Sequence, residues 1–116
     1  HDNNTTKGWY RKEISKVEKR NLQRYFEGIA ITENNIHRHL IRLAYASVAK
    51  LAIIPFQDVP GLDESSRFNA PATVENNWLW RMNQRQMSTR SSKWLCEQTT
   101  LFGRYDSGST ARKVNS

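Results

Sequence analysis

The chain of 116 residues has a net charge of +7 and one cysteine, Cys96, which excludes an internal disulfide framework and fits a reducing compartment. Apolar residues make up only 37% of it. The longest apolar run, residues 51–56, is far too short to span a bilayer. The first residues contain no basic start followed by an apolar stretch, so the sequence predicts no signal peptide.

The positive charge by itself would fit nucleic-acid binding. Between Arg11 and Arg24, however, Glu13 and Glu18 interrupt the basic residues, which is typical of a solvated helix face with mixed charges. The aromatic residues are also not interleaved with Lys and Arg as a single-strand stacking platform requires. We therefore expect no nucleic-acid partner.

Residues 1–8 are polar and predict a loop, whereas apolar residues recur with a helical period from residue 9 to residue 26. Gly28 is a natural stop for that helix. Thr32 is suited to cap a second helix over residues 35–49. His37 and His39 lie two positions apart on it and face different sides, so we interpret them as solvated or capping residues, not as joint metal ligands.

Residues 51–56, LAIIPF, form a continuous apolar run that predicts a strand buried on both faces, as in a parallel sheet. A helix that leads into such a strand favours the α/β class. Residues 57–77 predict a long loop of the kind that is usually functional, and residues 77–82 a possible helix behind an Asn cap.

The last predicted helix is capped by Ser91 or Ser92 and stops at Gly103. Cys96 lies beside Leu95 in this helix, and we expect it to be buried as a small apolar side chain. Residues 106–116 are rich in Ser, Gly and basic residues and predict a disordered tail.

Polar residues follow the predicted strand directly, at Gln57 and Asp58. In parallel α/β folds ligands bind at the carboxyl ends of strands, where His1, Asp2 and Asn69 would join them. Such side chains suit sugar hydroxyls, which both donate and accept hydrogen bonds. Turn and surface roles explain the same residue types, and from the residues alone they are the preferred interpretation, because Asn and Asp favour turns for local reasons.

Three segments resemble the amylomaltase, or disproportionating enzyme, family of 4-α-glucanotransferases in the α-amylase clan. HDNNTTKGWY at 1–10 is similar to the family's His-Asp segment, and IIPFQDVPGLDESSRFNAPATVENNWLWRM at 53–82 to its last barrel strand and following loop. HRHLIRLAYASVAKLA between them resembles the preceding helix. The departures are Asn4 where Asp is usual, Phe68 where Met is usual, and Ala72 and Asn76 where Gly is common.

The resemblance implies an α/β fold, with residues 1–105 as the C-terminal strand–helix units of a (β/α)8 TIM barrel that is incomplete in this chain. It implies retaining transfer of α-1,4-glucan segments between maltodextrins, without a cofactor or metal. The nucleophile and the acid/base of the family lie upstream. Asp2 matches the third conserved catalytic acid, and His1, Asn69, Gln57 and Asp58 are expected to bind substrate.

On this basis we expect maltodextrin as the partner, no membrane, and a need for the rest of the barrel in folding, so that the isolated chain is inactive. The expected location is the cytoplasm, with the plastid stroma as the alternative. Two other functions stay open: a small basic helical nucleic-acid-binding module and a carbohydrate-binding remnant without catalysis.

Overall fold

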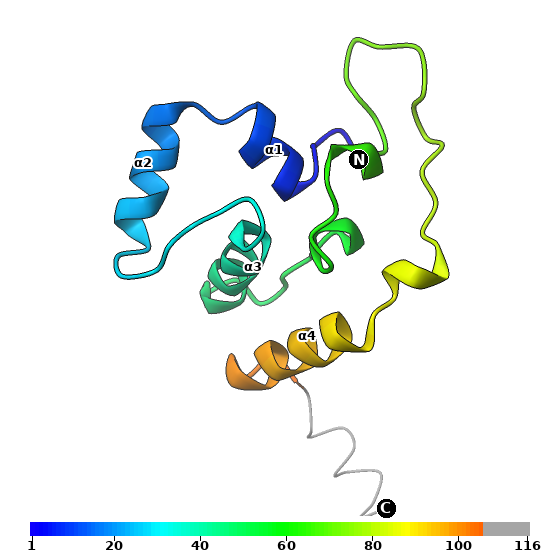
Figure 1. Ribbon diagram of the computed structural model, residues 1–116. Helices are drawn as coiled ribbons and strands as arrows, with labels where there is room; N and C mark the ends of the chain where they lie inside the picture. Colours follow the sequence, from blue (N-terminus) through cyan, green and yellow to red (C-terminus); the bar gives the residue numbers. More distant parts are fainter. Residues whose placement is uncertain (106–116) are drawn as a thin grey trace, which may run out of the picture.

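The computed structural model describes residues 1–105, and all regular structure within that range is helical (Figure 1). The elements in chain order are α1 (Thr6–Lys12), α2 (Lys16–Tyr25), α3 (Ile36–Ala46), the 3-10 turns η1 (Phe56–Asp58), η2 (Glu64–Ser66) and η3 (Gln84–Gln86), and α4 (Thr89–Leu101). Helix α1 packs on α3 and on η2, and α4 packs on α3. Residues 70–83 form an irregular loop that extends away from these helices (Figure 1).

The single helix predicted over residues 9–26 is two helices, because a capping box starts a new one. The Ser15 hydroxyl accepts the N–H of Glu18, and the Glu18 carboxylate accepts the N–H of Ser15. These two bonds satisfy donors that have no partner inside a helix. Gly28 then adopts a φ of +81°, a left-handed conformation that favours glycine, and this agrees with its predicted role as a stop.

The second predicted helix is present but shorter, as α3. Asn35 occupies the position before it, and Thr32 instead accepts the Ile36 N–H through its carbonyl at 3.0 Å. The core is small: among the described residues, the buried hydrophobic side chains are Ile31, Ile36 and Ile41. Ile36 and Ile41 come from α3, so the packing of α1 against α3 forms the centre of this structure.

The interpretation of His37 as solvated or capping is wrong, because its side chain is only 6% exposed. Its ring lies against Gly61, where an added Cβ would approach its Cε1 to 2.6 Å. Burial, with smaller contributions from nearby Arg38, Lys7 and His39, lowers the pKa of His37 to about 4. Its Nδ1 is buried without a hydrogen-bond partner among residues 1–105.

The strand predicted at residues 51–56 is not present in the described part of the chain. Residues 51–55 have no regular structure, and η1 begins at Phe56. Leu51 and Ile53 are 73% and 81% exposed. A strand needs a neighbour with which to share ladder hydrogen bonds, and residues 1–105 place none beside this segment. Much of this apolar run is therefore exposed to solvent.

The helix predicted at residues 77–82 is absent as well. Trp78 has a φ of +62°, and Asn83 caps only the short turn η3. The last predicted helix is confirmed as α4, although its cap is Ser88, whose hydroxyl accepts the N–H of Ser91. Gly103 follows it with a φ of +66°.

Two expectations about the end of the chain have different outcomes. The expectation that Cys96 is buried is wrong, because Cys96 is exposed on α4. Arg104 fastens the end of α4 to the segment after α3, donating to the carbonyls of Tyr45 and Ala49, each at 2.9 Å. The predicted disordered tail, residues 106–116, lies outside the described residues.

Candidate functional site

The predicted site residues His1, Asp2 and Asn69 meet, although Asn69 lies almost 70 positions from the other two. The Asn69 side-chain amide donates to Asp2 Oδ1 at 2.7 Å, across 67 residues of chain. His1 Nε2 lies 3.2 Å from the same oxygen. The side chains of His1 and Asp2 are both 58% exposed. The result is a carboxylate, an imidazole and an amide on an accessible surface.

Arg67 joins the same two segments through the backbone. Its Nε donates to the carbonyl of Asn69 at 2.7 Å, and its Nη2 donates to the carbonyl of Asp2 at 2.7 Å. Its Nη1 lies 3.4 Å from Glu13 Oε1. Unlike the site residues, the Arg67 side chain is only 22% exposed.

Asp58 lies beside the beginning of α1, where its carboxylate accepts two hydrogen bonds from Thr6. Oδ1 accepts the N–H of Thr6 at 2.8 Å, and Oδ2 accepts the Thr6 hydroxyl at 2.9 Å. A carboxylate at a helix N-terminus satisfies an orphan N–H and suits the helix dipole. Asp58 therefore fixes the helix that follows His1 and Asp2.

Gln57 is buried, and its side-chain amide donates to the carbonyl of Ser66 at 3.3 Å. This contact ties η1 to η2. Gln57 and Asp58 nevertheless line one pocket together with His1. That pocket has a volume of about 370 Å³, and Arg67, Phe68 and Trp80 also line it. His1 therefore connects two groups of predicted residues. It contacts Asp2, which binds Asn69, and it shares the pocket with Gln57 and Asp58, whereas Asp2 and Asn69 do not line that pocket.

Aromatic rings line the site. The Trp78 ring lies 4.8 Å from the His1 ring and 6.2 Å from the Phe68 ring, between ring centroids. Phe68 meets Trp80 edge-on at 5.5 Å. The backbone N–H of Trp78 donates to the carbonyl of Phe68 at 2.6 Å. The φ of Trp78, +62°, is unusual for a bulky residue. This strained backbone holds an exposed indole beside His1.

Sequence reasoning did not assign Arg67, Trp78 or Thr6 to the site. Arg67 and Trp78 stand within the quoted motif at 53–82, and this was the only signal for them. Thr6 stands within the quoted motif at 1–10, but its role depends on Asp58 being brought to the start of α1. None of these roles follows from spacing along the chain.

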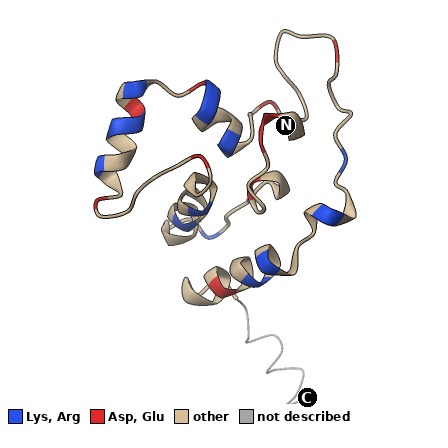
Figure 2. Ribbon diagram, in the orientation of Figure 1, with Lys and Arg blue, Asp and Glu red and all other residues tan. Residues whose placement is uncertain are grey.

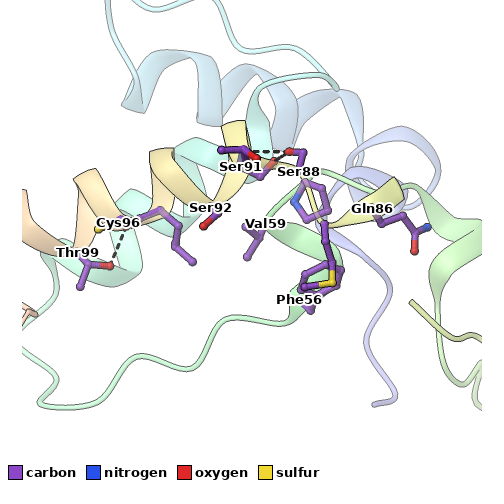
Figure 3. A pocket seen from close by; sticks show the side chains of 12 residues that line it. Phe56, Val59, Gln86, Ser88, Ser91, Ser92, Cys96 and Thr99 are labelled. Carbon is purple, nitrogen blue, oxygen red and sulfur yellow. Dashed lines mark hydrogen bonds between the residues drawn. The ribbon is translucent and has the colours of Figure 1, made fainter. Parts of the chain in front are cut away.

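A second, more apolar pocket lies between α4, η1 and η3 and has a volume of about 630 Å³. Figure 3 shows Ser88 and Ser91 joined by a hydrogen bond near one end of it and Cys96 and Thr99 near the other. It contains none of the predicted site residues. In the described part of the chain there is no group of three or more His, Cys, Asp or Glu side chains that would hold a metal ion.

The basic residues do not gather on one face. Figure 2 shows Lys and Arg on each of the four α-helices, with acidic residues beside several of them. Lys12 pairs with Glu64 at 2.7 Å, and Arg11 with Glu33 at 3.3 Å. Within residues 1–105, none of the helices is long and apolar enough to cross a membrane.

Comparison with known proteins gives matches in sequence and in structure. A family model described as 4-alpha-glucanotransferase matches residues 1–88. A 4-alpha-glucanotransferase of Streptococcus pneumoniae is 38% identical over 104 residues, which cover 90% of this chain and 20% of that protein. The chloroplastic/amyloplastic 4-alpha-glucanotransferase of Solanum tuberosum is 48% identical over 82 residues, which cover 71% of this chain and 14% of that protein.

Among solved structures, the amylomaltase from Streptococcus agalactiae in complex with acarbose matches with a TM-score of 0.79 at 29% identity. The match covers 89% of this chain and 20% of that one. The fold is thus that of a segment of an amylomaltase-like structure. The chain belongs to the 4-alpha-glucanotransferase family. It spans about a fifth of the length of the relatives it matches.

Proposed function

We propose that this chain is part of a longer 4-α-glucanotransferase that moves α-1,4-glucan segments between maltodextrins with retention of configuration. The observation that carries the proposal is the convergence of His1, Asp2 and Asn69, with Asn69 donating to Asp2 at 2.7 Å, in a chain of this family. The substrate class follows the names of the relatives.

Retention needs a carboxylate nucleophile and a carboxylic acid that later serves as base. In this proposal both come from parts of the protein outside residues 1–116. Asp2 is the third catalytic acid and binds hydroxyls of the sugar at the cleavage point. Those hydrogen bonds strengthen as positive charge develops on the ring, and this lowers the barrier.

The other predicted residues have supporting roles in the proposed site. His1 and Asn69 hold the carboxylate of Asp2 and add a hydrogen bond each to the sugar. Gln57 and Asp58 contribute polar groups from the floor of the pocket that they share with His1. The Asp2 Oδ2 atom accepts no hydrogen bond from residues 1–105 in the structure, and in the proposal it faces a sugar hydroxyl.

The barrel is proposed on the same basis. Residues 51–55 become the last strand when the neighbouring strands of the longer protein are present, because those neighbours supply the ladder partners. Residues 1–105 then form the C-terminal strand–helix units of a (β/α)8 barrel. The proposed partners are maltodextrins and the remainder of the barrel, with neither nucleic acid nor membrane, and the proposed location is the cytoplasm or the plastid stroma.

The test uses the parent protein, by which we mean the complete polypeptide that contains these residues. Purified parent protein incubated with maltotriose is expected to release glucose and to form longer maltodextrins, without net hydrolysis. A protein that only hydrolyses maltotriose, or leaves it unchanged, contradicts the proposal. Salt-sensitive retention on nucleic acid without transferase activity would instead support the basic binding module, and sugar binding without turnover the non-catalytic remnant.

A further inference from the structure

We infer that Arg67 is a positioning residue that clamps the Asp2 segment to the Asn69 segment and so sets the geometry of the sugar-binding carboxylate. The inference rests on the proposed function. The guanidinium of Arg67 makes three contacts: with the carbonyl of Asn69, the carbonyl of Asp2 and the carboxylate of Glu13.

The two carbonyl contacts determine how the two segments lie relative to each other. Both are 2.7 Å long, and both come from one planar, rigid group. The Asn69 amide reaches Asp2 Oδ1 at 2.7 Å only while these carbonyls keep their places. Since Asp2 and Asn69 lie outside every helix, no regular element of residues 1–105 holds them in register.

Arg67 is itself well anchored. Arg67 follows the last residue of η2, and its backbone N–H donates to the carbonyl of Glu64, the first residue of η2. η2 in turn packs against α1. Glu13, at the other end of α1, is held in turn by the side-chain amide of Asn4 at 2.7 Å. The guanidinium therefore connects the scaffold of α1 and η2 to two exposed segments that approach the substrate.

A lysine at this position keeps the charge but not the planar fork, because its ammonium is a compact point charge on a flexible stem. Orientation errors of about 1 Å at a reacting centre can cost on the order of 100-fold in rate. In the parent protein we therefore expect Arg67→Lys to lower kcat for maltotriose by about 10- to 100-fold, with KM changed less than about threefold and the folded fraction unchanged.

The experiment compares Arg67→Lys, Asp2→Asn and the double variant, with Arg90→Lys on the exposed face of α4 as the matched control. Because Arg67 acts through Asp2, the loss in the double variant should be well below the product of the two single losses. Added guanidinium should also restore part of the activity of Arg67→Ala, while it leaves the activity of Asp2→Asn unchanged.

Two results overturn the inference while the proposed function stands. One is an active parent protein whose Arg67→Lys variant keeps kcat within twofold. The other is a set of losses that multiply fully in the double variant, which is the behaviour of an independent structural site. A parent protein that does not redistribute maltotriose overturns the proposed function itself and with it the role of Arg67. If Arg67→Ala does not fold, the lysine variant and the double variant carry the test.

Discussion

Asp2 is the residue on which the proposed chemistry depends. Its carboxylate lies in contact with Asn69 and His1 and is accessible to a ligand. In the parent protein, Asp2→Asn keeps the size of the side chain, removes the charge and replaces an acceptor oxygen with a donor. We expect kcat to fall by about 10²–10³, or ~3–4 kcal/mol of barrier, with little change in KM. Steady-state kinetics of maltotriose disproportionation measure both constants.

Two control variants accompany this measurement. His1→Ala should cost less than Asp2→Asn, since it removes one hydrogen-bonding ring, whereas Asp2→Asn removes the charge of the carboxylate. Cys96→Ser should leave both constants nearly unchanged, because Cys96 is exposed on α4 and does not line the pocket shared by His1, Gln57 and Asp58. If kcat of Asp2→Asn stayed within about threefold of the parent value, Asp2 would not be the third catalytic acid.

His37 predicts a pH dependence of stability. The pKa of its imidazole falls from 6.5 to about 4 in the folded protein, chiefly because burial disfavours the charged form. The unfolded chain therefore binds more protons between these values, and stability rises with pH across the interval. The contribution is complete above about pH 6.5 and is lost as pH falls toward 4, up to about 3 kcal/mol.

Urea unfolding of the parent protein at pH 4 to 7 measures this effect, and His37→Gln is the matched variant because it does not titrate. The difference in unfolding free energy between the two proteins should vary with pH within this window. A difference that stays constant from pH 4 to pH 7 would show that protonation of His37 is not linked to folding.

At the scale of the element, Asp58 and Thr6 are expected to stabilise the start of α1. Both oxygens of Asp58 accept from Thr6. Asp58→Ala should therefore lower the unfolding free energy of the parent protein by about 1–2 kcal/mol, the usual cost of losing a helix cap. Thermal unfolding of Asp58→Ala, Thr6→Ala and the double variant gives the coupling between the two residues.

The same variants separate anchoring from substrate binding at Asp58. If Asp58 acts only through α1, Thr6→Ala should change the stability and KM for maltotriose in the same way as Asp58→Ala. A rise in KM confined to Asp58→Ala would support the direct contact with sugar that we propose. Full additivity of the stability losses would contradict the role of the pair as one cap.

At the scale of the whole molecule, the described residues do not form a compact domain. The radius of gyration is 16.7 Å, against about 13 Å for a compact domain of this size. Large apolar side chains such as Val48, Leu51, Ile53 and Val74 are exposed. The exposure of several large apolar side chains suits a chain that packs against further protein.

We therefore expect the isolated 116-residue chain to show no transferase activity on maltotriose or longer maltodextrins, because its proposed nucleophile and acid/base lie elsewhere. It should also bind a dye specific for exposed apolar surface, such as ANS, and associate in a concentration-dependent way. Glucose release by the purified chain would refute the first expectation. The parent protein at equal concentration is the control and should bind much less dye.

Local sequence determined where most of the helices lie. Apolar period and capping residues predicted helical structure over residues 9–26, 35–49 and 91–102, since those signals act within a few positions of each other. The two quoted motifs also indicated the family. The break at Ser15 is equally local, but the apolar period continues across its capping box and by itself predicts one helix.

Tertiary structure alone decided the rest. Residues 51–56 have the composition of a strand, but a strand forms only where another segment supplies its ladder partners. His37 is buried because the turn at Gly61 lies against its ring, and spacing along α3 does not encode that contact. The contacts of Asp2 with Asn69 and with Arg67 join positions more than 60 residues apart. Residue type determined which groups can hold a sugar, whereas packing over long sequence separations decided which of them meet.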